Sequence, residues 1–304
     1  MTNGKFLNGE TCIECLHVGL AEDEGGALAM SRHGSLLCKH KTITNYQCPI
    51  VCGFVGLCLI LGMLMLCSSC VSIGNKGTIK MYPSPNYNER KYPVSMIILH
   101  YTVIPTCEES LMRLSETTNE TGNVSAHYLV DRDGSIYSLV DESKRAWHAG
   151  LGSWAGLDDI NSRSIGIEIV NVGLTEDGKR EPFLAAQIDA VIKLCKDIQS
   201  RYAIKYVLGH SDVAPQRKQD PGEAFQWKRL AEAGIGIWTD AFAEPKKSVP
   251  EMLSEIGYDV FDMDKAVVAF QRHFYPEAIT SGATNTVGRM AAIYDITQSK
   301  QMER

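Results

Sequence analysis

The chain has 304 residues, 44% hydrophobic and 22% charged, and its 36 acidic and 30 basic residues give a formal net charge of −6. This composition provides enough apolar surface for one ordinary core and a smaller second one, which excludes disorder over most of the chain. The acidic balance argues against a protein held to nucleic acid by a basic surface, so we expect no nucleic-acid partner.

Cysteines concentrate at the start of the chain. Of the ten cysteines, all but Cys107 and Cys195 lie within the first 70 residues, so the rest of the chain does not depend on a disulfide framework. Whether Cys107 and Cys195 pair stays open. Residues 1–48 read as a leader that is too long and too mixed in charge for the basic part of an export signal. Met30 offers a more suitable start, so this leader could lie upstream of the true first residue.

An apolar segment with a lipidation-like end follows, over residues 49–70. Residues 49–67 carry no charge and are long enough to cross a bilayer or to serve as the apolar part of an export signal. The next residues complete the sequence L-C-S-S-C, which resembles the lipobox of bacterial lipoproteins and marks Cys70 as the lipidated residue. An uncleaved membrane anchor is the alternative. Both interpretations predict export and attachment to a membrane.

The remainder predicts a mixed α/β domain followed by a small all-α module. Residues 71–90 are polar and aperiodic and are typical of a linker. Within 91–240, strand patterns at 94–101, 164–170 and 204–210, a hairpin within 128–140 and an amphipathic helix at 185–202 indicate a central mixed β-sheet flanked by helices. A second linker-like stretch precedes residues 250–304, whose apolar spacing predicts short helices.

Two histidines and an aspartate suggest a metal site. His100 ends one predicted strand, His210 ends another, and Asp220 follows in a loop. Two imidazoles and one carboxylate suit zinc and leave a fourth position for water. The alternative is that each histidine is a structural residue at the end of an apolar strand.

Glu168 and Lys218 are candidates for catalysis. Glu168 lies on the opposite strand face from Ile167 and Ile169, where an unpartnered carboxylate is costly to bury. It could be a general base or a salt-bridged core residue. Lys218 precedes Asp220 by two residues, so its ammonium could stabilise an oxyanion, or it could be a solvated surface lysine.

These residues stand in motifs that resemble a known family. ILHYT around His100, VSAHYLVDRDGSIYSLV, AWHAG, NSRSIGIEIVN around Glu168, and GHSDVAPQRKQDPGEAFQW resemble the zinc N-acetylmuramoyl-L-alanine amidases of the type-2, peptidoglycan-recognition-like family, nearest to AmiD-type lipoprotein amidases. The resemblance implies one Zn²⁺ per chain on His100, His210 and Asp220, with Glu168 and Lys218 catalytic. It places substrate-binding or pocket roles on Trp147, His148, His127 and Arg217. Residues 250–304 resemble the peptidoglycan-binding module of AmiD-type proteins.

The resemblance implies hydrolysis of the amide bond between N-acetylmuramic acid and L-alanine in peptidoglycan stem peptides, for cell-wall turnover or recycling. The expected partners are peptidoglycan, muropeptides and a membrane. The expected location is the outer membrane of a Gram-negative bacterium, facing the periplasm. The alternative is a non-catalytic peptidoglycan-recognition lipoprotein, which this fold becomes when its metal ligands are lost. All three ligand positions are filled here, which favours the enzyme.

Overall fold

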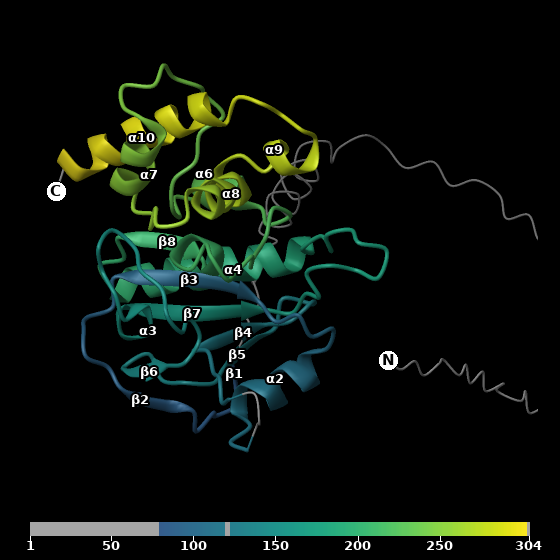
Figure 1. Cartoon of the computed structure of the whole chain (residues 1–304). Coiled ribbons are helices and arrows are strands. Elements are labelled where there is room, and N and C mark those ends of the chain that lie inside the picture. Colours follow the sequence, from purple (N-terminus) through teal and green to yellow (C-terminus); the bar gives the residue numbers. More distant parts are fainter. Residues whose placement is uncertain (1–78, 119–121, 303–304) are drawn as a thin grey trace, which may run out of the picture. The chain divides into compact units, whose positions relative to one another are not determined.

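A six-stranded mixed sheet organises the fold in the computed structural model, which describes residues 79–118 and 122–302 (Figure 1). The strand order is β1-β5-β4-β7-β3-β8, with β4 and β5 antiparallel and the other neighbours parallel. The strands are β1 Lys80–Met81, β3 Met96–Tyr101, β4 Tyr128–Val130, β5 Ile136–Ser138, β7 Ser164–Ile169 and β8 Tyr206–Gly209. A two-stranded antiparallel ribbon pairs β2 (Tyr87–Glu89) with β6 (Lys144–Ala146). The predicted mixed sheet and its hairpin are confirmed.

One face of the sheet packs against α4 (Ala185–Arg201), the helix predicted from its apolar stripe. Ile188, Val191, Cys195 and Ile198 of this stripe are buried. They belong to the same apolar core as the residues that alternate along the central strands, which are Ile97, Leu99, Ile165, Ile167 and Ile169. The alternation works because successive strand side chains point to opposite faces, so every second residue faces the helix.

A second apolar core joins the sheet to the C-terminal helices, which lie beside β8 at the top of Figure 1. Met96, Ile98 and Leu208 of the strands share this core with Phe270 and Phe274. The helices of this region are α6 Trp227–Glu232, α7 Val249–Ile256, α8 Met263–Phe274, α9 Glu277–Thr280 and α10 Thr286–Met302. The helices predicted for 250–304 are therefore present. They pack within the same compact unit as the sheet, instead of standing apart behind a linker.

The segment expected to be a linker, 71–90, takes part in the fold over its described residues. β1 and β2 both lie in it, and the guanidinium of Arg90 donates hydrogen bonds to the carbonyls of Ser162, Ser164 and Lys144 at 2.6 to 3.0 Å. Strands of two and three residues are too short to show an alternating pattern, so the sequence gives no periodic signal there. The described part of 71–90 is thus the first portion of the domain.

Three further helices complete the described part of the fold: α2 Cys107–Ser115, α3 Ile160–Arg163 and α5 His210–Val213. Cys107 and Cys195 are both free thiols, and burial raises the pKa of Cys195 to about 12. The predicted leader at 1–48 and the apolar segment at 49–70 lie outside the described residues. Among the residues that are described, no helix has the length and apolar character needed to cross a membrane.

Candidate active site

The carboxyl ends of three parallel strands bring the candidate residues together. His100 lies near the end of β3, directly opposite Glu168 of β7 in the strand register, and His210 follows β8 as the first residue of α5. His100 shares the strand face of Met96 and Ile98, away from the α4 core. This is the edge of a parallel α/β sheet at which ligands ordinarily bind.

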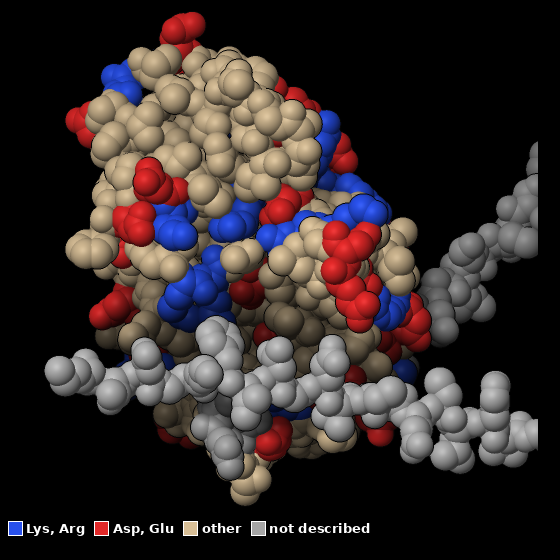
Figure 2. All heavy atoms as spheres, turned by 45° about the vertical axis from the view of Figure 1, so that its right-hand side comes forward, with Lys and Arg blue, Asp and Glu red and all other residues tan. Residues whose placement is uncertain are grey.

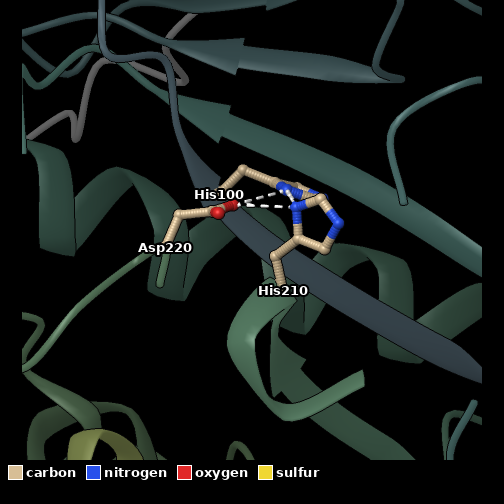
Figure 3. A group of neighbouring side chains, drawn as sticks. All are labelled: His100, His210 and Asp220. Atoms are coloured by element: carbon tan, nitrogen blue, oxygen red, sulfur yellow. Dashed lines mark hydrogen bonds and ion pairs between the residues drawn. The ribbon is translucent and has the colours of Figure 1, made fainter. Parts of the chain in front are cut away.

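The three predicted metal ligands converge on one point, as Figure 3 shows. Nδ1 of His100 lies 3.0 Å from Nδ1 of His210, and Oδ2 of Asp220 lies 2.9 Å and 3.0 Å from these two nitrogens. All three residues are buried. Burial alone would raise the pKa of Asp220, but the neighbouring His210 and His100 hold it well below its usual value. Asp220 is therefore a carboxylate.

A chain of hydrogen bonds fixes the orientation of the His100 ring. The hydroxyl of Ser164 donates to the carbonyl of Ile160 at 2.6 Å, so its oxygen accepts from Nε2 of His148 at 3.2 Å. Nδ1 of His148 is then the acceptor for Nε2–H of His100 at 3.0 Å. Burial lowers the pKa of His148 well below 6.5 and that of His100 to about 4, so both rings are neutral at pH 7. This arrangement leaves the Nδ1 lone pair of His100 directed at the site.

The A-W-H-A-G segment at residues 146–150, which contains His148, also orients the second histidine. Nε2 of His210 donates to the carbonyl of Ala149 at 2.9 Å, so its Nδ1 also presents a lone pair. The backbone N–H groups of His148 and Ala149 both donate to Oδ1 of Asn161, at 3.1 and 2.7 Å. The A-W-H-A-G segment therefore supports both imidazoles, as the partners of metal-binding histidines do.

The geometry fits a divalent metal ion. Two nitrogen lone pairs and a carboxylate oxygen converge at 2.9 to 3.0 Å in a buried place, which is electrostatically unfavourable without a cation between them. Tetrahedral zinc with bonds of about 2.0–2.1 Å would place its ligand atoms about 3.3 Å apart, close to the spacing found. A His₂Asp set of this kind suits zinc and leaves a fourth position free.

Glu168 faces the same cleft with a carboxylate oxygen that lacks a partner. Its Oε2 is buried and accepts no hydrogen bond. Burial, together with the charge of Asp220, raises the pKa of Glu168 to about 8, while the Lys218 ammonium acts in the opposite direction. A cation on the three ligands would also lower this pKa, because it favours the charged carboxylate. The group is thus poised to exchange a proton near neutral pH.

The cleft has a volume of about 350 Å³ and brings together most of the predicted site residues. Its wall contains His100, Trp147, His148, Glu168, His210, Lys218 and Asp220. The indole N–H of Trp147 donates to Oδ1 of Asn88 at 3.1 Å, which fixes the ring at the edge of the cleft.

Two predicted pocket residues lie elsewhere. His127 is fully buried, accepts from the N–H of Gly166 at 2.9 Å, and is absent from the cleft wall. Arg217 also stands outside the wall, where its Nε donates to the carbonyl of Leu151 at 2.9 Å. The predicted substrate contacts of these two residues find no support in this arrangement.

The structure adds supporting residues that the sequence analysis did not single out. Ser164 and Asn161 hold the A-W-H-A-G segment, and Asp212 supports the turn that follows His210. Ser and Asn at loop and strand ends are too common to stand out in one sequence. Asp212 is the aspartate of the G-H-S-D sequence. Its position two residues after His210 was the feature of the sequence that could have identified it as a supporting residue.

Comparisons with known proteins agree with this geometry. Residues 90–223 match the model of a family described as N-acetylmuramoyl-L-alanine amidase. The chain is 38% identical over 217 residues to N-acetylmuramoyl-L-alanine amidase AmiD of Escherichia coli K12, covering 61% of this chain and 76% of that protein.

Solved structures give the same picture. The complex of E. coli AmiD with anhydro-N-acetylmuramic acid-L-Ala-D-gamma-Glu-L-Lys superposes with a TM-score of 0.59 at 36% identity, covering 69% of this chain and 90% of that one. The complex of AmpDh3 from Pseudomonas aeruginosa with an anhydromuramic pentapeptide gives a TM-score of 0.59 at 34% identity, with 69% and 94% covered.

Proposed function

This chain belongs to the N-acetylmuramoyl-L-alanine amidase family, and from that premise we propose that it acts as a zinc enzyme in peptidoglycan turnover. The reaction is hydrolysis of the amide bond between the lactyl group of N-acetylmuramic acid and the L-alanine of the stem peptide. His100, His210 and Asp220 would hold one Zn²⁺ ion. The observation that carries the proposal is the convergence of these three ligand atoms in the cleft that also contains the unpartnered oxygen of Glu168.

The residues of the cleft divide the chemistry between them. A Zn²⁺ ion on the three ligands would polarise the scissile carbonyl and increase the acidity of water beside it. Glu168 removes a proton from the attacking water as the new C–O bond forms at the carbonyl carbon. The Lys218 ammonium stabilises the negative charge that develops on the carbonyl oxygen. Glu168 then gives its proton to the alanine nitrogen as the C–N bond breaks, which releases the stem peptide with a free amine.

The alternative, a recognition protein without catalysis, explains less of the site. Binding of a muropeptide needs a cleft and polar contacts, but it does not need three convergent ligand atoms. It also does not need a carboxylate whose pKa burial raises to about 8. Burying a carboxylate costs free energy, and a site that only binds a ligand gains nothing from it. A residue that transfers protons, in contrast, depends on a pKa near the working pH.

Muropeptides with an anhydromuramyl end are the first substrates to test. Both the AmiD and the AmpDh3 complexes contain an anhydromuramyl peptide. We therefore propose soluble muropeptides as substrates, with peptidoglycan as the polymer that supplies them. Figure 2 shows that the C-terminal helices, at its top, present a mostly uncharged surface on this side, which is compatible with a carbohydrate polymer. Residues 250–304 are accordingly our candidate for contact with the wall.

The location of the enzyme is a separate proposal that rests on the sequence of residues 49–70. We propose that the chain is exported and that Cys70 becomes its lipidated first residue at the outer membrane, facing the periplasm. The supporting features are the uncharged run at 49–67 and the serines before Cys70. Mass spectrometry of the cellular protein should find an acylated fragment that begins at Cys70. Recovery of an unmodified peptide spanning residues 66–72 would favour the uncleaved anchor instead.

The reaction is tested by mass analysis of products from purified anhydromuropeptides. We expect free stem peptide and the sugar acid, with turnover lost after treatment with a chelator and restored by Zn²⁺. A sample that binds the muropeptide yet returns it intact, with Zn²⁺ present, would contradict catalysis and favour the recognition protein.

A further inference from the structure

Asp212, two residues after His210, carries a buried carboxylate that the C-terminal helices hold in place. Its Oδ1 accepts from the hydroxyl of Tyr258 at 2.6 Å. Its Oδ2 accepts from Nδ1–H of His273 at 2.6 Å and from the backbone N–H of Gly209 at 2.7 Å. The residue is 0% exposed, and a carboxylate buried so completely is tolerated only when its oxygens are bonded in this way. Neither Tyr258 nor His273 lines the cleft, so they do not contact substrate there.

The position of Asp212 determines the backbone from which His210 projects. α5 has four residues and begins at His210, and the bond from Gly209 to the Asp212 carboxylate closes its first turn. The N–H of Ser211 donates to the carbonyl of Asp220 at 2.9 Å, which joins this turn to the residue that supplies the third ligand atom. A shift of Asp212 would therefore move His210 relative to Asp220.

The helix that carries His273 also reaches the second ligand-bearing segment. Arg272, the neighbour of His273 on α8, places its Nε 3.9 Å from the carboxylate of Glu223. Glu223 follows Asp220 by three residues and accepts from Nε of Arg180 at 2.7 Å. Two consecutive residues of α8 thus contact both segments that supply metal ligands. The ring of His273 also stacks on the ring of Trp227, with ring centroids 3.7 Å apart, and this stacking fixes the orientation of His273 toward Asp212.

We propose that Asp212, held by Tyr258 and His273, is a positioning residue that places His210 for metal binding. The C-terminal helices then determine part of the metal affinity, in addition to any contact they make with the cell wall. This inference rests on the proposed function, because it assumes that His100, His210 and Asp220 are the metal ligands. Tyr258 and His273 act through Asp212, to which both are hydrogen-bonded, and neither of them lines the cleft.

A role in packing alone predicts a different result. Removing one bond from a purely structural network lowers the stability of the protein, but leaves the metal affinity of the folded molecule unchanged. Removing a bond that positions a ligand weakens the affinity, because the ligand atoms no longer start in the binding geometry. Metal affinity, measured under conditions where the protein is folded, therefore separates the two roles.

The test uses Tyr258→Phe in the full chain, with Tyr294→Phe as its matched control. Tyr258→Phe removes one hydroxyl and keeps the ring that packs against Trp154, with ring centroids 4.8 Å apart. Tyr294 is also a buried tyrosine of the C-terminal helices, and its hydroxyl donates to Glu255 at 3.0 Å, which links α10 to α7. The measurements are the Zn²⁺ dissociation constant, by competition with a chromogenic chelator, and the absorption spectrum with Co²⁺ in place of Zn²⁺.

We expect Tyr258→Phe to raise the Zn²⁺ dissociation constant about tenfold and to change the Co²⁺ spectrum, as loss of a residue that supports a ligand does. Tyr294→Phe should stay within about twofold of the wild type in both measurements. Asp212→Asn should weaken binding further than Tyr258→Phe. If Asp212→Asn fails to fold, the comparison of the two tyrosine variants still decides.

Equal Zn²⁺ dissociation constants for Tyr258→Phe, Tyr294→Phe and the wild type would overturn the proposal, and so would equal weakening in both variants. A wild-type chain that binds Zn²⁺ but releases no stem peptide would contradict the proposed reaction only, since the affinities can still be compared. A wild-type chain that binds no Zn²⁺ would contradict both.

Discussion

The two faces of the central sheet follow different rules. Toward α4 the sheet presents Ile97, Leu99 and Ile167, whose side chains pack against the apolar stripe of that helix through hydrophobic contacts. Toward the cleft the same strands present His100 and Glu168, and the supporting residues behind them are buried polar groups such as Ser164. One residue of register separates the two kinds of surface, because strand side chains alternate between the faces.

The difference shows on which face of the sheet the residue type is more strictly constrained. On the α4 face, hydrophobic residues of suitable volume are interchangeable at modest cost. On the cleft face the supporting polar groups depend on particular hydrogen-bond partners, as in the series from Ile160 through Ser164 and His148 to His100. Substitutions on the two faces should therefore separate stability from metal binding and turnover.

The largest effect is expected from substitution of the three proposed zinc ligands. His100→Ala, His210→Ala and Asp220→Ala should each lose bound Zn²⁺ and turnover together, since a three-ligand site cannot hold the ion firmly with two. Metal content and product release should be measured on the same samples. Retention of Zn²⁺ by His100→Ala, or its loss from His127→Ala instead, would show that the ligand set has been misread.

Substitution of Glu168, the proposed general base, should separate catalysis from metal binding. Glu168→Gln should keep Zn²⁺ and the fold but lose turnover by about a hundredfold or more, as expected for a missing general base. Lys218→Ala should also keep the metal and lose about a hundredfold in turnover through lost stabilisation of the oxyanion. Turnover of Glu168→Gln close to the wild type, with zinc bound, would exclude Glu168 as the base.

Substitution of the residues that support His100 should have a smaller effect than substitution of the proposed ligands themselves. His148→Phe removes the acceptor for Nε2–H of His100, and we expect a loss of about tenfold in Zn²⁺ affinity, as found for the partners of metal-binding histidines. Ser164→Ala, one bond further away, should lose less. Equal Zn²⁺ affinities for His148→Phe and the wild type would mean that the ring of His100 is oriented by packing alone.

Buried neutral histidines should make stability depend on pH. Burial lowers the pKa of His127 to about 3 from its ordinary 6.5, so between these values the unfolded chain binds a proton that the folded one does not. Stability is therefore lost as the pH falls below 6.5, by about 2 kcal/mol from His127 between pH 7 and pH 5. Urea unfolding of metal-free wild type and His127→Gln at both pH values should show a smaller difference for the variant. Identical differences would contradict this account.

The smallest effect is expected on the α4 face. Ile188→Val removes one buried methyl group and should lower the free energy of unfolding by about 1 kcal/mol. Zn²⁺ affinity and turnover per folded molecule should stay as in the wild type, since Ile188 belongs to the apolar core on the side of the sheet away from the cleft. A loss of turnover in this variant, measured well below its unfolding temperature, would show that the two faces are coupled.

Local sequence determined much of the molecule. Period-two alternation predicted the central strands and the faces of Ile165 and Glu168, and three- and four-residue spacing predicted α4, because each pattern follows from the geometry of one element. The family motifs also identified His100, His210 and Asp220, whose ligand atoms the fold brings within 3.0 Å of one another. Short edge strands such as β1 and β2 gave no pattern and were missed.

Tertiary structure alone decided how the parts support one another. Residues 250–304 looked like a detached module, yet Phe270 shares a core with Met96, because a pattern of apolar residues says that a face is buried but not against what. His127 and His148 looked alike in sequence, yet only His148 lines the cleft. The bonds from Tyr258 and His273 to Asp212 join residues 46 and 61 positions apart, and such contacts are set by packing that no local pattern encodes.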